Sequence, residues 1–126
     1  MPLTHISMLR GKSECYQQAV FDSVGHALHE TFNVPKGNQF MVIHEHDPVS
    51  FRFGASFLGI ERSTDLLYIQ ITANNTRTLE QKKQMYQRIT ELLGANPGVR
   101  PEDVFINLIE VAKENWSLGN GLAQYA

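Results

Sequence analysis

Apolar positions recur along this chain with an offset of 65 residues, so that its first half lies in register with its second. The matching apolar residues are Leu3 and Tyr68, Ile6 and Ile71, Val20 and Met85, Val24 and Ile89, Leu28 and Leu93, Val34 and Val99, and Phe40 and Phe105. A single match of this kind arises by chance, but a run across most of both halves does not. The pattern therefore indicates a duplicated structural unit.

Each half begins with a predicted strand and a helix cap. Residues 3–8 form a short stretch with recurring apolar positions, and residues 66–72 are rich in β-branched and aromatic side chains, which favour strands. Ser13 and Thr78 follow these stretches, and a hydroxyl side chain can accept a hydrogen bond from a free amide at the start of a helix. We therefore predict that a helix begins after each of them.

Both halves continue with an amphipathic helix and a second strand. Apolar residues recur three and four positions apart after each cap, which places them on one face of a helix. These stripes are Val20, Val24, Ala27 and Leu28 in the first half, and Met85, Ile89, Leu92 and Leu93 in the second. Proline and glycine within 35–38 and 94–101 end the helices, and residues 40–44 and 104–111 are predicted to be strands.

The predicted fold is of the α/β class. Two β-α-β units form one four-stranded sheet with both helices on one face, because each crossover is right-handed and buries its apolar stripe. We predict one domain over 1–126, with repeats at about 2–46 and 66–111, a linker at 47–65 and a tail at 112–126. The apolar linker is expected to pack on the sheet or on a neighbouring subunit, and the tail to dock on another chain.

Composition narrows the classes of function. Lysine and arginine number 11 against 13 acidic residues, for a net charge of −2, so the basic patch of a nucleic-acid-binding protein is not expected. One cysteine can form neither an intrachain disulfide nor a cysteine metal cluster. The chain lacks the run of about 20 apolar residues that spans a membrane, and its first residues lack the apolar core of a signal peptide. We therefore expect a soluble cytoplasmic protein with no nucleic-acid or membrane partner.

Pro2 is the first candidate for chemistry. Removal of Met1 would leave the nitrogen of Pro2 as a terminal secondary amine, and a terminal amine has a pKa of about 7.7–8.0. An apolar pocket or a nearby arginine would lower that pKa, and a neutral amine can then take a proton from a carbon beside a carbonyl. The alternative is that proline is simply tolerated as a second residue.

Histidines near the predicted second strand are a candidate metal site. On a strand, His44 and His46 would point to the same face, and His5 or Asp47 could be a third ligand. Histidines that form hydrogen bonds at a strand end are the commoner arrangement. We therefore predict no metal site.

Several motifs together resemble a known family. They are Pro2-Leu3, the duplicated β-α-β pattern, Val34-Pro35 before the second strand, and a tail that reads NWSLGNG over 115–121 and continues with Ala123-Gln124-Tyr125. This combination resembles the malonate semialdehyde decarboxylase group of the tautomerase superfamily. The resemblance covers nearly the whole chain, and it implies a homotrimer with three active sites, each around an amino-terminal proline, with no metal or organic cofactor.

The resemblance also implies roles for individual residues. Pro2 matches the catalytic proline of the family, and Arg77 matches an arginine that binds the substrate carboxylate or polarises its carbonyl. A guanidinium suits this role because its planar fork binds two oxygens and keeps its charge. Trp116, Leu118 and Tyr125 match the apolar wall that shields the proline from water.

Two departures from the family pattern bear on the reaction. Asn75 stands where the pattern often has a second arginine, and Asn38-Gln39 stands where it usually has Asp-Arg. An amide can orient a water or a substrate but cannot take its proton, so decarboxylation or hydration that needs the aspartate is less favoured. Asn38, Gln39 and Asn75 are therefore assigned to substrate binding.

These observations predict an enzyme that uses Pro2 as general base and acid on a small α-keto or 3-oxo carboxylic acid, with keto–enol tautomerisation as its reaction. Two alternatives remain open. One is a malonate semialdehyde decarboxylase or hydratase activity. The other is a module of the same fold that binds a small ligand without turning it over, since two β-α-β units also form regulatory ferredoxin-like domains.

Overall fold

Four strands form one mixed sheet in the order β2–β1–β3–β4. The structure is a computed structural model that describes residues 2–126, and the predicted removal of Met1 lies outside the described residues. The strands are β1 (Leu3–Leu9), β2 (Phe40–His46), β3 (Leu67–Asn74) and β4 (Val104–Val111). Each unit contributes a parallel pair, and the two units meet through the antiparallel pair β1–β3.

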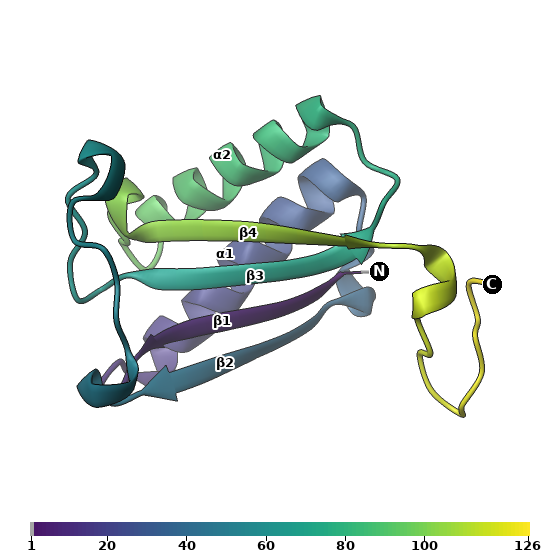
Figure 1. Ribbon diagram of the computed structural model, residues 1–126, viewed down its shortest axis with the longest axis horizontal. Helices are drawn as coiled ribbons and strands as arrows, with labels where there is room; N and C mark the ends of the chain where they lie inside the picture. The colour runs from purple at the N-terminus through teal and green to yellow at the C-terminus, as the bar shows by residue number, and fades with distance from the viewer. Residues whose placement is uncertain (1) are drawn as a thin grey trace.

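Two helices cover one face of this sheet (Figure 1). They are α1 (Glu14–Phe32) and α2 (Leu79–Ala95), and each connects the two parallel strands of its unit. Ser13 accepts a hydrogen bond from the amide of Tyr16, and Thr78 forms a capping box with Gln81. The predicted α/β class, the duplicated β-α-β arrangement and both caps are confirmed.

The core lies between the sheet and the helices. Alternate side chains of β1 and β3 point toward the helices and are buried, as their period of two requires. The largest buried apolar side chains are Ile6, Met8, Leu28, Leu66, Leu67, Ile69, Ile71, Met85, Ile89 and Leu93. The opposite face of the sheet is open and exposes Phe40, Val42, Phe105 and Ile109.

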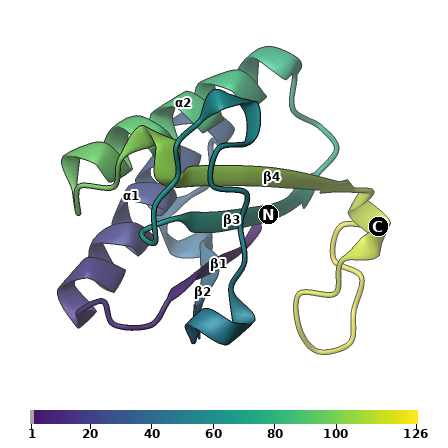
Figure 2. The ribbon, with the colours of Figure 1, turned by 60° about the vertical axis from the view of Figure 1, so that its left-hand side comes forward.

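The linker packs on the open face of the sheet, as expected. The ring of Phe51 lies 5.3 Å from that of Tyr68, and the Tyr68 hydroxyl donates a hydrogen bond of 2.6 Å to the carbonyl of Arg52. The buried carboxylate of Asp103 accepts from the amide and the hydroxyl of Ser63, at 2.7 and 2.6 Å. Figure 2 shows this segment crossing in front of the strands. The linker is therefore an ordered part of the fold.

Two strands end two residues later than predicted. β2 runs on to His46, and β3 runs to Asn74, because the backbone of Asn74 still pairs with Val111 of β4. After β4 the chain continues through a short turn into residues 116–126, which lie at the same end of the sheet as the amino terminus (Figure 1). Within residues 2–126, no helix is long and apolar enough to cross a membrane.

Candidate active site

A pocket of about 350 Å³ opens at the end of the sheet where β1 and β2 begin. Its lining residues are Pro2, Leu3, Phe40, Trp116, Ser117 and Leu118. Leu3 and Phe40 are register partners in the parallel pair β1–β2, so they lie side by side. Residues 116–118 come from the tail beyond β4. The structure therefore brings Pro2, Trp116 and Leu118 together, although they lie at opposite ends of the chain.

The walls of this pocket are mostly apolar. Pro2 is buried, and Leu3, Phe40, Trp116 and Leu118 surround it with hydrocarbon and aromatic surface. Such a setting disfavours a charged amine more than a neutral one. Two larger hollows, of about 510 and 600 Å³, lie between α1 and β2 and on the open face of the sheet. Their linings are more polar and contain none of the residues matched to the catalytic proline, the arginine or the apolar wall.

Trp116 is held by a residue that the sequence analysis missed. The indole Nε1–H donates a hydrogen bond of 2.7 Å to the side-chain oxygen of Asn74, which is 8% exposed. Asn74 is the last residue of β3, and the prediction ended this strand at residue 72. Had the predicted strand been two residues longer, it would have ended at Asn74 and placed this side chain beside the tail. The length of β3 is therefore what the sequence did not reveal.

Arg77 lies at the same end of the molecule, in the turn before α2. Its guanidinium carbon is 4.7 Å from the centre of the Phe32 ring, and its Nη2 donates a hydrogen bond of 2.9 Å to the carbonyl of Phe32. Burial lowers the pKa of Arg77, and the nearby phenol of Tyr125 partly opposes that shift. A guanidinium keeps its charge at neutral pH even so. Arg77 and Tyr125 do not line the pocket around Pro2.

The three predicted amide residues lie away from the pocket. Asn38 is exposed in a short 3-10 helix, Lys36–Asn38, and Asn75 is exposed in the turn after β3. The side-chain amide of Gln39 donates a hydrogen bond of 2.6 Å to the carbonyl of Gly25 in α1. None of the three is among the residues that surround Pro2 in this structure.

Two of the sheet histidines, His5 and His44, contact each other, while the third, His46, lies against the ring of Phe51. His5 and His44 lie on the open face with Nδ1 and Nε2 2.8 Å apart and their rings within 6° of parallel. Asp47 forms an ion pair of 3.1 Å with Arg10. In the part of the chain from 2 to 126, no group of three or more histidine, cysteine or acidic side chains is placed to hold a metal ion.

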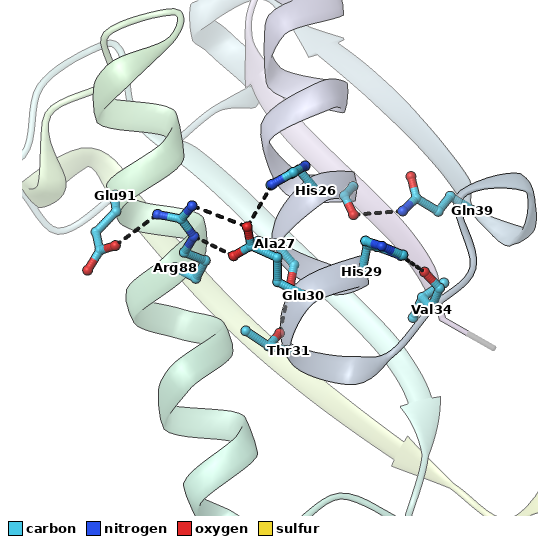
Figure 3. Close-up of polar contacts among 10 residues, drawn as sticks. His26, Ala27, His29, Glu30, Thr31, Val34, Gln39, Arg88 and Glu91 are labelled. Atoms are coloured by element: carbon cyan, nitrogen blue, oxygen red, sulfur yellow. Dashed lines mark hydrogen bonds and ion pairs between the residues drawn. The ribbon is translucent and has the colours of Figure 1, made fainter.

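A surface ion-pair network joins the two helices (Figure 3). Arg88 of α2 contacts Glu30 of α1 at 2.6 and 3.2 Å and Glu91 at 3.2 Å, and His26 contacts Glu30 at 2.7 Å. Hydrogen bonding to Arg88 lowers the pKa of Glu30, and the same contact raises that of Arg88. The network lies in the last turns of α1, which ends at Phe32, the residue that contacts Arg77.

Comparison with known proteins gives consistent results. A family described as "Tautomerase enzyme" matches residues 38–119. "Probable tautomerase YusQ" of Bacillus subtilis (strain 168) is 38% identical over 98% of both chains, and "Probable tautomerase YrdN" of the same organism is 26% identical over 99% of this chain and 96% of its own.

Two solved structures are similar over nearly their whole length. One is a malonate semialdehyde decarboxylase, with a TM-score of 0.92 and 25% identity over 98% of this chain and 95% of the other. The second is FG41 malonate semialdehyde decarboxylase inhibited by 3-bromopropiolate, with a TM-score of 0.90 and 35% identity over 98% and 93%. The similarity therefore includes both the strand that follows Pro2 and the tail that carries Trp116.

Proposed function

This chain belongs to the tautomerase family, and from that premise we propose that it is an enzyme that uses the amine of Pro2 to move a proton on a small α-keto or 3-oxo carboxylic acid. The observation that carries this proposal is the burial of Pro2 in an apolar pocket formed with Trp116 and Leu118. The proposal requires that Met1 be removed, because an acylated proline nitrogen cannot act as a base.

The apolar pocket supports general base catalysis. Walls of this kind penalise a charged amine, so we expect the pKa of the Pro2 amine to fall below the usual value of about 7.7–8.0. The neutral nitrogen takes a proton from the carbon beside the carbonyl. The C–H electron pair forms the carbon–carbon double bond of the enol, and the carbonyl π pair moves to oxygen. The protonated amine then delivers its proton to that oxygen, and ketonisation runs in reverse.

Arg77 is the proposed partner for the substrate carboxylate. Its contact with the carbonyl of Phe32 uses one of the five N–H donors of a guanidinium and holds the group in one orientation. The remaining donors can bind a carboxylate with two parallel hydrogen bonds. The phenol of Tyr125 lies near enough to Arg77 to affect the pKa of the guanidinium, and it belongs to the same end of the molecule. No metal or organic cofactor takes part in this proposal.

We propose that the working form is a homotrimer. The open face of the sheet exposes four apolar side chains: Phe40, Val42, Phe105 and Ile109. Exposed apolar surface of this kind is typical of an interface. Arg77 does not line the pocket around Pro2 within one chain, and packing of copies against one another could bring a second chain to that pocket. Asn38, Gln39 and Asn75 remain proposed substrate contacts only in such an assembly.

A decarboxylase or hydratase activity is the second candidate. The observation that favours it is the 35% identity to FG41 malonate semialdehyde decarboxylase over almost the whole chain. The amide of Asn38 cannot take a proton from water, however, and this favours tautomerisation as the main reaction. Release of carbon dioxide from a 3-oxo acid distinguishes the two.

The test combines mass and turnover. Intact mass should show loss of Met1, and incubation with 3-bromopropiolate should add one adduct that maps to Pro2 and abolishes ketonisation of phenylpyruvate. The Pro2→Ala variant should lose both labelling and turnover while its circular dichroism spectrum shows that it is still folded. A protein that lacks Met1 yet is neither labelled nor active would refute the enzyme and favour the binding module.

A further inference from the structure

Within residues 2–126, one hydrogen bond joins the sheet to residues 116–126, the tail that closes the pocket around Pro2. The indole Nε1–H of Trp116 donates to the side-chain oxygen of Asn74 at 2.7 Å, and the asparagine lies buried at the end of β3. Asn74 is held in place by the backbone ladder, since it pairs with Val111 of β4. The acceptor is therefore rigid, while the donor belongs to a segment outside the regular structure.

In the described part of the chain, the other hydrogen bonds of residues 116–126 stay within that segment. The amide of Leu118 donates to the side-chain oxygen of Gln124 at 2.9 Å, and the Gln124 amide group donates to the carbonyl of Gly119 at 2.9 Å. The amide of Leu122 also donates to Gly119, at 3.3 Å. Within residues 2–126, the contact between Asn74 and Trp116 is the one hydrogen bond that joins residues 116–126 to the sheet or helices.

We propose that Asn74 is a positioning residue for the active site: its side-chain oxygen fixes the indole of Trp116, and with it Leu118, against Pro2. The inference rests on the proposed function of Pro2. Without the acceptor, the half-buried indole N–H loses its partner and the indole is free to turn. Water then reaches the pocket, and a wetter pocket makes the Pro2 amine easier to charge.

The single tryptophan of this chain makes the contact directly measurable. Trp116 emission and its quenching by acrylamide report only on the pocket wall. The Asn74→Leu variant keeps the size of the side chain and removes the acceptor, so its emission should move to longer wavelength and its quenching should increase. Asn74→Asp keeps an acceptor oxygen at the same place and should restore the wild-type emission. Asn115→Ala is the matched control, since the Asn115 side chain makes no hydrogen bond within the described part of the chain.

Turnover tests whether the position of the indole matters to the chemistry. Asn74→Leu should lower kcat/KM for phenylpyruvate about three- to tenfold, the effect expected for one neutral hydrogen bond. The acidic limb of its pH profile should move to higher pH, which a purely structural role would not cause. Trp116→Phe keeps an aromatic wall and removes the donor. Adding Asn74→Leu to this variant should therefore not lower kcat/KM further.

The outcomes separate this inference from the proposed function. A wild-type protein that is neither labelled by 3-bromopropiolate nor active would overturn the function of Pro2, whatever the fluorescence shows. A labelled, active wild type whose Asn74→Leu variant has the same emission, kcat/KM and pH profile would overturn only the role of Asn74. A full, additive loss in the double variant would overturn it too, because Asn74 would then act independently of the indole.

Discussion

Replacement of Thr4 by valine should stabilise this protein. Thr4 lies on β1 with its side chain toward the helices and is fully buried, with a relative exposure of 0%. Its register partners are Met41 and Ile71, which are apolar. Within residues 2–126, the hydroxyl of Thr4 has no hydrogen-bond partner. Folding therefore strips water from this hydroxyl without replacing the lost hydrogen bond.

The expected gain follows from the cost of such a group. A buried donor or acceptor without a partner costs about 1–3 kcal/mol, and valine has nearly the same shape as threonine with a methyl group in place of the hydroxyl. We expect a gain of about 1–2 kcal/mol in the free energy of unfolding. The unfolding entropy of a chain of 126 residues is roughly 0.26 kcal/mol/K, so the melting temperature should rise by about 4–8 °C.

The assay is thermal and urea unfolding followed by circular dichroism, at one protein concentration. Thr72→Val is the control, because Thr72 lies on the open face of β3 and is only half-buried. Its substitution should change the free energy of unfolding by no more than about 0.5 kcal/mol. A Thr4→Val protein that is less stable than the wild type would show that the hydroxyl has a partner, such as a buried water. Labelling of Pro2 should be unchanged, since Thr4 is not among the residues that line the pocket.

Three further predictions concern charge and packing. Arg77→Lys should lower kcat/KM for phenylpyruvate about tenfold or more, because an ammonium lacks the planar fork that binds a carboxylate; an unchanged value would exclude Arg77 from the site. The pKa of Glu30 is lowered from 4.5, so its contact with Arg88 contributes stability above that pH and loses it as the pH falls through the lower pKa of the folded state. In urea unfolding at several pH values, Glu30→Gln should lose less free energy of unfolding than the wild type as the pH falls. An equal dependence on pH in both proteins would contradict the contact. Gly25→Ala should be nearly neutral: a new Cβ would lie 2.2 Å from the side-chain oxygen of Gln39 and displace it, but the lost hydrogen bond of about 1 kcal/mol is offset by the helix preference of alanine, also about 1 kcal/mol. A loss above about 2 kcal/mol in unfolding would show that Gln39 cannot move aside.

The sequence was sufficient to predict the fold because its signals are local. Apolar spacing of three and four residues identified both helices, and hydroxyl residues identified where they begin. The repeat showed that the second unit copies the first, and right-handed crossovers then left one face for both helices. These properties depend on neighbours along the chain, which a sequence displays directly.

The pocket itself was only partly predictable. Pro2, Trp116 and Leu118 were selected from the sequence, and the structure brings them together. Their proximity depends on both β-α-β units joining one sheet, because only then does the tail after β4 lie beside the start of β1. Only the tertiary structure shows that Arg77 packs on Phe32, at 4.7 Å, instead of lining this pocket in the same chain.

Asn74 and Asn75 show most clearly what the sequence determined and what it left to the tertiary structure. Both are asparagines at the end of an apolar stretch, and the family resemblance assigned a role to Asn75 alone. The backbone ladder with β4 extends through Asn74, so this residue lies buried beneath the indole of Trp116, while Asn75 lies exposed in the turn. Because side chains alternate between faces along a strand, one residue more or less in a strand decides which asparagine reaches the site. Strand length is set by pairing with a distant segment, and that pairing exists only in the folded chain.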